Sequence, residues 1–535
     1  TFIGNGVEIT TIQRSYDQFV TRSVRESNSS YYRLEKFTEL SAQIDNILAD
    51  PQGGISPILQ DFFSSLQDVA DDPTSGSARY QLLSTAESMV NRFRSLDTRL
   101  EQLTANTEND IGTAVDEINQ LAQSIADINR RLAAGDAVIM TASELCEAVR
   151  CGTQVQFDDL DVVTSGTCGL MSGTYAVLSF KFSEPNRFVR ASQIHFNGIE
   201  GYPGPCPNER IGIIDAVVHG TSHSQLDPNY GGGHLFKDIV GGQKIEVEVI
   251  TDEGKTLSGY VTIDQMTHAV LHGSRHAFRN YVGFVNPGKD PIETIFCSSA
   301  LPPNYGGATA CGCGELNPVQ KDPGLRTIGV GTRVMLNGGT GFVTGLGTRS
   351  SVERPCLSVV ADMHTMNPDY MGGFQTSAGP EVIQTWAVPI PILDETVLRT
   401  AKILDEEIPL VITDIRGRQA VREATYAQLW LGTARGFGFD EDACHAYRSK
   451  CLDCPPALLC PSRAFTEKKD KIDGKICCNC GICAVTCHGN CFIGEIGGIQ
   501  VDGRQVPFIQ RLSDRTKASV AAKELKENLL AQTFE

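Results

Sequence analysis

The spacing of apolar residues changes about a quarter of the way along the chain. From Ala78 to Ile111 there is no Gly or Pro, and apolar residues recur at the three- and four-residue intervals of one helix face. An earlier helix is predicted over residues 31–48, before the breaker that begins at Asp50-Pro51. We therefore predict that residues 1–125 form an elongated all-α segment of two or three amphipathic helices, in a bundle or coiled coil.

Short β-like runs replace this helical spacing beyond residues 125–137. Runs such as YAVLSFKF, KIEVEVIT and RVMLNGGTGFVTG alternate with glycine-rich turns, which predicts an α+β core domain over residues 126–440. Residues 441–505 are rich in cysteine and have little periodicity, and a charged helix is predicted within 506–535. The fold class is thus a multidomain protein with helical, α+β and small cysteine-rich parts.

Charge and hydropathy narrow the range of partners. The formal net charge of −18 argues against a nucleic-acid or anionic-membrane partner, because phosphate binding needs clustered Lys and Arg. The sequence has no apolar run of membrane-spanning length and does not open on a signal-like segment. We expect a cytoplasmic protein, and the sequence does not fix its oligomeric state.

Cysteine usage is the most informative feature of the composition. All 18 cysteines lie between Cys146 and Cys491, and six of them fall within CCNCGICAVTCHGNC at residues 477–491. Such crowding in a long acidic chain favours metal binding in a reducing compartment over a disulfide framework, which is typical of small secreted domains.

The spacing within this stretch is that of bacterial ferredoxins, whose pattern is matched by Cys477, Cys480, Cys483 and Cys487. Two-residue gaps let a short loop wrap three corners of a cubane, and Gly481 allows the backbone to approach it closely. Cys460, followed by Pro461, is well placed in sequence to close the same cluster. One [4Fe–4S] cluster is therefore predicted on Cys460, Cys477, Cys480 and Cys483.

A second [4Fe–4S] cluster is a weaker prediction from the same region. It would take Cys451, Cys454 and Cys487, together with one of Cys444, Cys478 or Cys491. Ala457 stands where a third ligand of the upstream motif is expected. The alternative is a zinc ribbon on Cys451, Cys454, Cys477 and Cys480, but a ribbon leaves Cys460, Cys483 and Cys487 without a role.

Four cysteines outside this region are candidate nucleophiles: Cys168, Cys206, Cys311 and Cys313. Cys168 lies where an apolar run meets a Gly/Ser/Thr turn, a geometry that would expose the thiol and lower its pKa. Cys206 lies between prolines and near Arg210. Cys311 and Cys313 are separated by one glycine in ATACGCGELNP, where they could bind a metal together or form a reactive pair. For each of the four, a buried small apolar residue is an equally good interpretation.

Three further patterns have ordinary structural explanations. His268, His272 and His276 would share one face of a helix, but the HExxH pattern of metal sites is absent. The glycines from Gly339 to Gly345 follow Asn337-Gly338, which predicts a hairpin and not a dinucleotide loop. PNYGG occurs at residues 228–232 and 303–307, either as an internal duplication or as a turn sequence that recurs by chance.

Two family resemblances divide the chain. Residues 1 to about 131 resemble the flagellar hook-associated protein of the hook–filament junction (FlgK) through GNGVEITTIQRSYDQFV, SAQIDNILADPQGG and ESMVNRFRSLDTRL. Residues from about 124 to the end resemble the homocysteine-biosynthesis (HcyBio) family, and within it the methanogenesis marker 16 metalloproteins of methanogenic archaea. The carrying segments are DVVTSGT, FNGIEGYPG, YGGGHLFKDIVGG and LPPNYGGATACGCGELNP, followed by the ferredoxin-like tail. The chain therefore looks like a fusion.

The second resemblance implies an activity. Members of the family insert sulfur into an aldehyde, as when aspartate semialdehyde, sulfide and two electrons give homocysteine. This implies a small aldehyde, a sulfur donor and an electron-donor protein as partners. The family pattern places a reactive cysteine after Met171, where this chain has Ser172, and a second cysteine after the YGGxH segment has no counterpart between Lys244 and Gly259. Cys168 is then the first candidate nucleophile. The alternatives are a non-catalytic iron–sulfur carrier and, for the N-terminal part, a flagellar junction subunit.

Overall fold

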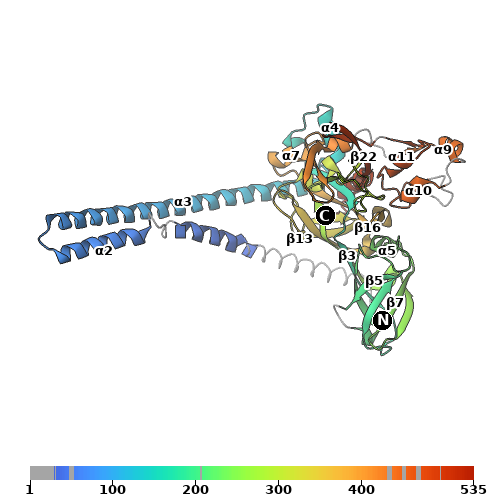
Figure 1. Ribbon diagram of the computed structural model, residues 1–535, viewed down its shortest axis with the longest axis horizontal. Helices are drawn as coiled ribbons and strands as arrows, with labels where there is room; N and C mark the ends of the chain where they lie inside the picture. The colour runs from blue at the N-terminus through green and yellow to red at the C-terminus, as the bar shows by residue number, and fades with distance from the viewer. Residues whose placement is uncertain are drawn as a thin grey trace. The chain divides into compact units, whose positions relative to one another are not determined.

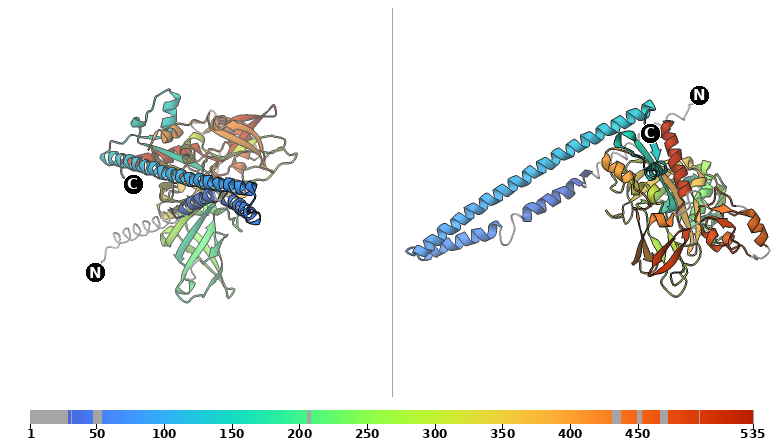
Figure 2. Two further views of the ribbon diagram at one scale, coloured as in Figure 1. Left: turned by 90° about the vertical axis from the view of Figure 1, so that its left-hand side faces the viewer. Right: turned by 90° about the horizontal axis from the view of Figure 1, so that it is seen from above.

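The computed structural model describes residues 29–30, 32–46, 54–204, 208–430, 437–448, 453–465, 472–494 and 496–534. The chain divides into two compact units, residues 1–126 and 127–535. The boundary between the two units therefore falls where the spacing of apolar residues along the sequence changes. Figures 1 and 2 show long helices in the first unit and a sheet-rich second unit.

The first unit is helical, as predicted. A helix covers residues 32–46, followed by α2 (Ile55–Asp71) and α3 (Gly76–Ala134). The hydroxyl oxygens of Ser65 on α2 and Thr85 on α3 are 2.6 Å apart, so these two helices lie side by side across the turn that joins them (Figure 1). The apolar stripe read from the sequence is therefore part of one helix of 59 residues.

A large mixed sheet dominates the second unit. Its 14 strands run in the order β1-β2-β16-β12-β13-β14-β9-β3-β6-β5-β4-β7-β8, with β15 paired to β16. The strands are β1 (Ile139–Thr141), β2 (Val162–Leu170), β3 (Thr174–Lys181), β4 (Ala191–Phe196), β5 (Ile199–Pro203), β6 (Ile213–His219), β7 (Ile245–Thr251), β8 (Thr256–Val261), β9 (Met266–Phe278), β12 (Arg333–Leu336), β13 (Gly339–Leu346), β14 (Cys356–Asp362), β15 (Gly372–Thr376) and β16 (Gly379–Pro391). The predicted sheet-rich region is confirmed.

A second sheet of six strands joins the middle of the chain to its cysteine-rich region. Its order is β18 (Ala420–Thr425), β17 (Pro409–Asp414), β10 (Gly283–Val285), β11 (Ala308–Ala310), β22 (Arg504–Arg511) and β21 (Gly498–Val501). Strand β22 pairs in parallel with β11. The boundary predicted at residue 505 thus lies inside a strand, and the cysteine-rich region shares a sheet with the core. A short ladder pairs β19 (Gly438–Phe439) with β20 (Phe492–Ile493).

Helices cover these sheets and connect their strands. The described helices of the second unit beyond α3 are α4 (Ala142–Arg150), α5 (Gly232–Val240), α6 (Pro318–Lys321), α7 (Glu395–Ala401), α8 (Tyr426–Leu429), α9 (Glu441–Arg448), α10 (Pro455–Leu459), α11 (Ile482–Thr486) and α12 (Arg515–Leu530). Asp514 caps α12 by accepting hydrogen bonds from Thr516 N and Lys517 N. The buried face of α12 packs on β2 and β16, so the predicted C-terminal helix forms part of the core.

The contact between α12 and β2 depends on a glycine. A Cβ atom at Gly166 would lie 2.3 Å from the carbonyl oxygen of Ala518. We expect Gly166→Ala to lower the free energy of unfolding by about 2 kcal/mol, because backbone on both sides must move to admit the methyl group. Chemical denaturation of the full chain measures this change. Gly329→Ala is the control, since no atom lies within 4 Å of its added Cβ, and an equal loss in both variants would contradict the explanation.

The three histidines lie on a strand, so the shared helix face that a helical stretch would have given them does not form, and they are ordinary exposed or packed side chains. All three belong to β9, where pairing with β3 and β14 overrides the local helical spacing. His268 is exposed, His272 stacks on Tyr175 with ring centroids 4.9 Å apart, and His276 is fully buried. The three histidine side chains therefore differ strongly in burial.

Of the two glycine-containing turn patterns, the structure supports the hairpin at Asn337-Gly338 and not a duplication of PNYGG. Asn337 and Gly338 have φ values of 50° and 82° and join β12 to β13, so the hairpin prediction is confirmed. The two PNYGG segments differ in conformation, because Asn304 and Tyr305 of the second have positive φ and their counterparts in the first do not. The first segment leads into α5 and the second into β11. The structure therefore gives the duplication no support.

Candidate functional site

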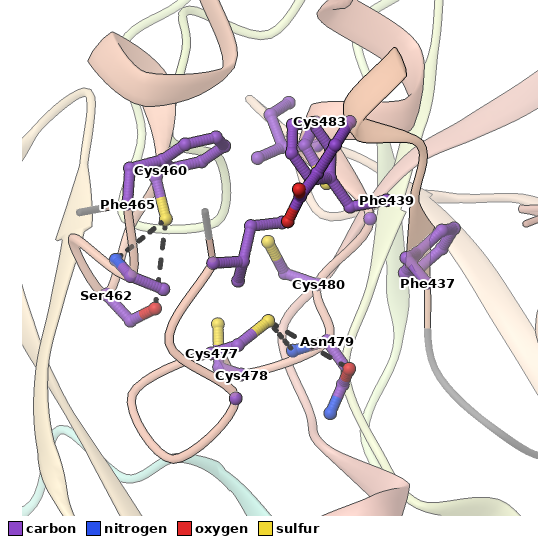
Figure 3. Close-up of a pocket in the computed structure, with 16 residues that line it drawn as sticks. Phe437, Phe439, Cys460, Ser462, Phe465, Cys477, Cys478, Asn479, Cys480 and Cys483 are labelled. Atoms are coloured by element: carbon purple, nitrogen blue, oxygen red, sulfur yellow. Dashed lines mark hydrogen bonds between the residues drawn. The ribbon is translucent and has the colours of Figure 1, made fainter. Parts of the chain in front are cut away.

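Five cysteines line one cavity of about 320 Å³ in the second unit: Cys460, Cys477, Cys478, Cys480 and Cys483. Cys460 comes from the end of α10, and the other four come from the loop before α11 and from α11 itself. Gly481 between them has a φ of 82°, and an added Cβ would lie 2.4 Å from Ile496, so the turn requires glycine. Figure 3 shows sulfur atoms from both segments facing the same space.

Backbone donors distinguish four of these thiols from the fifth. Ala464 N donates to Cys460 Sγ and Asn479 N donates to Cys477 Sγ, each over 3.4 Å. The sulfurs of Cys480 and Cys483 likewise accept backbone hydrogen bonds, from Ile482 and Ala484. Cys478 instead shares a hydrogen bond with Cys480. Hydrogen bonds to ligating sulfurs are characteristic of iron–sulfur sites, and the four thiols that accept them are the predicted ligand set.

The cavity disfavours free thiolates. Burial, together with neighbouring cysteines, raises the pKa of Cys477 and of Cys483 to about 12. The pKa of Cys460 is also raised, mainly by burial. These thiols are therefore protonated at neutral pH unless a cation replaces their protons.

The number of cysteines around the cavity is sufficient for the four thiolate ligands of a [4Fe–4S] cluster. Within the described residues, no three His, Cys, Asp or Glu side chains lie close enough together to hold one metal ion. A single zinc ion draws its sulfur ligands to about 2.3 Å from one point, whereas a cubane fills the space between its ligands. Four cysteines around a cavity are thus a fitting donor set for [4Fe–4S]. Cys454, the described upstream member of the alternative zinc ribbon, is not among the residues that line this cavity.

A second group of cysteines lies at the other end of the loop. Cys491 forms hydrogen bonds with Cys487 and with Cys444 of α9. Of the three candidates for completing the second cluster, Cys444 and Cys491 therefore lie with Cys487, and Cys478 lies in the first cavity. Cys454 caps α10. Cys451 lies outside the described residues.

Three of the four candidate nucleophiles meet in the core, although they are far apart in the sequence. Cys168 N donates to Cys313 Sγ over 3.5 Å, and Cys313 Sγ donates to Cys168 O over 3.4 Å. Cys311 Sγ lies 3.5 Å from the hydroxyl oxygen of Ser513. We call Cys168, Cys311 and Cys313 the core thiol group. The fourth candidate, Cys206, lies outside the described residues.

The core thiol group is buried, which corrects the expectation of an exposed thiol with a lowered pKa at Cys168. Strand β2 continues to Leu170, so Cys168 lies within the strand and not at a turn. Burial raises the pKa of the Cys168 thiol, with a further increase from nearby Asp514. Burial also raises the pKa of Cys311 to about 11. A reaction here would take place away from bulk water, with neutral thiols in the resting state.

One short segment connects the core thiol group to the cysteine-lined cavity. At its start, Arg511 N donates to Cys480 O over 2.8 Å, and at its end Asp514 N donates to Cys168 O over 3.0 Å. Between them, Ser513 pairs with Gly169 on the edge of β2 that β1 leaves open. The carboxylate of Asp514 also accepts from the Asn479 side chain over 3.2 Å. The cavity and the thiols are therefore neighbours within one unit.

Two polar residues of this site, Asp514 and His276, were not predicted as site residues from the sequence. Asp514 is fully buried, and its Oδ2 has no hydrogen-bond partner among the described residues. An Asp before a helical stretch predicts an N-cap, but its place between two cysteine groups depends on β22. His276 lies beside Cys311 in a small cavity, and only strand pairing could have revealed this.

The fold and the site define a sheet-rich protein with a cysteine-lined cavity beside buried thiols. Over residues 137–535 the chain matches the family described as homocysteine biosynthesis enzyme, sulfur-incorporation. The chain belongs to this family. An uncharacterized protein of Methanothermobacter thermautotrophicus is 41% identical over 411 residues, which are 76% of this chain and 93% of that protein. The L-aspartate semialdehyde sulfurtransferase of Methanocaldococcus jannaschii is 30% identical over 335 residues, which are 58% of this chain and 63% of that enzyme.

The N-terminal residues match a different family. Residues 41–148 match the helical domain of flagellar hook-associated protein FlgK. Flagellar hook-associated protein 1 of Salmonella typhimurium is 36% identical over 131 residues, 24% of each chain. The chain thus combines two unrelated parts, and the two family matches overlap over residues 137–148. No solved structure matches the chain. Among the described helices, none is both long and apolar enough to span a membrane.

Proposed function

We propose that the second unit is an iron–sulfur enzyme that incorporates sulfur reductively into a small aldehyde. Membership of the sulfur-incorporation family supports this. So do the L-aspartate semialdehyde sulfurtransferases of M. jannaschii and Methanosarcina acetivorans, 30% and 29% identical to this chain. An aldehyde of the aspartate semialdehyde type is the proposed acceptor. The proposed partners are a sulfur donor and an electron-donor protein.

In this proposal the cluster is held by Cys460, Cys477, Cys480 and Cys483. The lining of the 320 Å³ cavity and the backbone donors to these sulfurs support the assignment. A second cluster would use Cys451, Cys454 and Cys487, together with Cys444 or Cys491, both of which lie beside Cys487. A bound cluster supplies electrons one at a time.

The proposed reaction balances when the electron-donor protein supplies two electrons. An aldehyde, sulfide, two electrons and two protons give a thiol and water. The new bond joins sulfur to the carbonyl carbon, and the carbonyl oxygen leaves as water. The core thiol group suits the sulfur-handling step, because its burial excludes the water that would compete for the carbonyl.

The main support for the proposal comes from the hydrogen bonds of the segment from Arg511 to Asp514. Its hydrogen bonds reach Cys480 at one end and Cys168 at the other, so the reducing group and the thiols would lie within one rigid framework. A protein that only carried clusters to a partner would need no such connection to buried thiols.

The proposal is tested by purifying the full chain without oxygen and counting its iron and inorganic sulfide. The protein is then given aspartate semialdehyde, sulfide and a low-potential reductant. We expect about four iron atoms per cluster and reductant-dependent formation of a thiol. A preparation that contains zinc and no iron would contradict the cluster, and a full cluster without thiol formation would favour a carrier.

A further inference from the structure

A lysine and a cysteine form a buried pair in the second unit. Lys321 Nζ, at the end of α6, lies 3.0 Å from the sulfur of Cys146 on α4. Both side chains are completely buried, although lysine is among the residues least often found inside a protein. The two residues are 175 positions apart in the sequence. Neither belongs to the core thiol group or lines the cavity of the proposed cluster.

The contacts of the pair direct the amine toward the sulfur. Lys321 Nζ donates to Ile403 O over 2.9 Å and to the Cys146 sulfur over 3.0 Å. The Cys146 thiol donates to the same carbonyl oxygen, with its sulfur 3.8 Å away. The thiol proton is therefore turned toward the backbone, and the sulfur lone pairs remain for the amine. Nitrogen and sulfur are held in contact from two sides.

Burial makes Cys146 a slow nucleophile. It raises the pKa of the Cys146 thiol, and the nearby charge of Lys321 offsets this increase only in part. The thiolate is the reactive form of cysteine, so this residue is poorly suited to repeated turnover. Hydrogen peroxide is close to water in size and reaches buried groups through local opening of the fold. A sulfur oxidised in this way meets the lysine amine first.

We propose that Lys321 and Cys146 are a site of oxidative crosslinking, at which one oxygen atom from a peroxide joins the lysine nitrogen to the cysteine sulfur. The separation of the two atoms favours this bond. A direct nitrogen–sulfur bond is much shorter than the 3.0 Å in the structure, and it would require α4 and α6 to move together within a close-packed core. One bridging oxygen spans nearly the observed separation.

The crosslink consumes two molecules of hydrogen peroxide. The sulfur of Cys146 attacks the first, which gives a sulfenic acid and water. The second oxidises the Lys321 amine to a hydroxylamine and is reduced to water. The hydroxylamine oxygen then bonds to the sulfenic sulfur, whose hydroxyl leaves with the hydroxylamine O–H proton as a third water. The pair has then lost four electrons and two hydrogen atoms and gained one oxygen atom.

The crosslink would join α4 covalently to the segment that carries one of the core thiols. Arg150 at the end of α4 already donates to Glu315, two residues after Cys313, over 2.8 Å. A bond between Cys146 and Lys321 closes a loop across 175 positions, and loop closure stabilises a fold mainly by constraining the unfolded chain. The oxidised protein should therefore unfold at a higher temperature than the same protein after reduction.

Mass analysis of the peroxide-treated full chain tests the inference. The protein is purified without oxygen, exposed to hydrogen peroxide, alkylated and digested with trypsin. We expect the peptide that contains Cys146 to be joined to the peptide that contains Lys321. The linked product should have one oxygen atom more and two hydrogen atoms fewer than the separate peptides, and cleavage after Lys321 should be lost. Dithiothreitol should restore both separate peptides.

Two variants and one native cysteine provide the controls. Lys321→Met and Cys146→Ser each remove one partner, so neither should give the linked peptides or the reversible rise in unfolding temperature. Circular dichroism establishes that each variant is folded. Cys356 is a buried thiol that donates to a backbone oxygen, Thr348 O. Peroxide should add oxygen to Cys356 without linking it to another peptide.

The wild-type measurement decides the question even if neither variant folds. A Cys146 peptide that carries added oxygen beside an unmodified Lys321 would overturn the inference. So would linked peptides without the extra oxygen atom, or a Cys146 that stays reduced after Cys356 has been oxidised. The crosslink needs no cluster, aldehyde or sulfur donor. A protein that contains no iron or forms no thiol would therefore overturn the proposed function and leave this inference standing.

Discussion

Cys460→Ala should abolish binding of the first cluster and, with it, reductive sulfur incorporation. Cys460 is the one residue of the proposed ligand set that comes from outside the 477–483 loop, and its sulfur accepts a hydrogen bond from Ala464 N. Its removal leaves three thiols of the proposed ligand set, one fewer than a [4Fe–4S] cluster needs. Iron and sulfide counts, with the visible absorbance of the anaerobic protein, measure the loss.

Cys478→Ala is the matched control for this prediction. Cys478 lines the same cavity and, like Cys480, is buried, but it bonds to Cys480 and not to a backbone donor. We expect this variant to keep its cluster. Cluster loss in Cys478→Ala and retention in Cys460→Ala would show that the ligand set has been assigned to the wrong thiols.

The second large effect is expected at Cys168. Cys168→Ala should reduce thiol formation from the aldehyde by at least about 1,000-fold, as removal of an essential nucleophile does in other enzymes, while the cluster remains. The residue keeps its backbone bonds to Cys313 and Asp514 in this variant, so the loss would report the missing thiol. Steady-state product formation and cluster absorbance are measured on the same preparation.

Cys356→Ala separates this effect from the general cost of a core substitution. Cys356 is a buried cysteine on β14 whose thiol donates to Thr348 O. It lies outside the core thiol group, so its replacement should leave turnover near the wild-type level. Equal losses in Cys168→Ala and Cys356→Ala would assign the effect to packing and would remove Cys168 from the proposed chemistry.

Local patterns in the sequence determined several features of this protein. Helical spacing of apolar residues predicted the long helices of the first unit, and Asn337-Gly338 predicted the β12–β13 hairpin. These features depend on neighbours within a few residues, where backbone hydrogen bonds and φ preferences act directly. The cysteine spacing from Cys477 to Cys487 is equally local, and the ligand set proposed from it remains a prediction that the cavity supports.

Only the tertiary structure decided which distant residues meet. Cys168, Cys311 and Cys313 converge because β2 and the residues after β11 become neighbours, and the segment after β22 joins them to Cys480. The same packing reversed the expected pKa of Cys168, since desolvation disfavours a thiolate wherever no cation compensates it. Strand pairing likewise buried His276 in the core. Burial and long-range pairing depend on the whole sheet, and no short stretch of sequence contains that information.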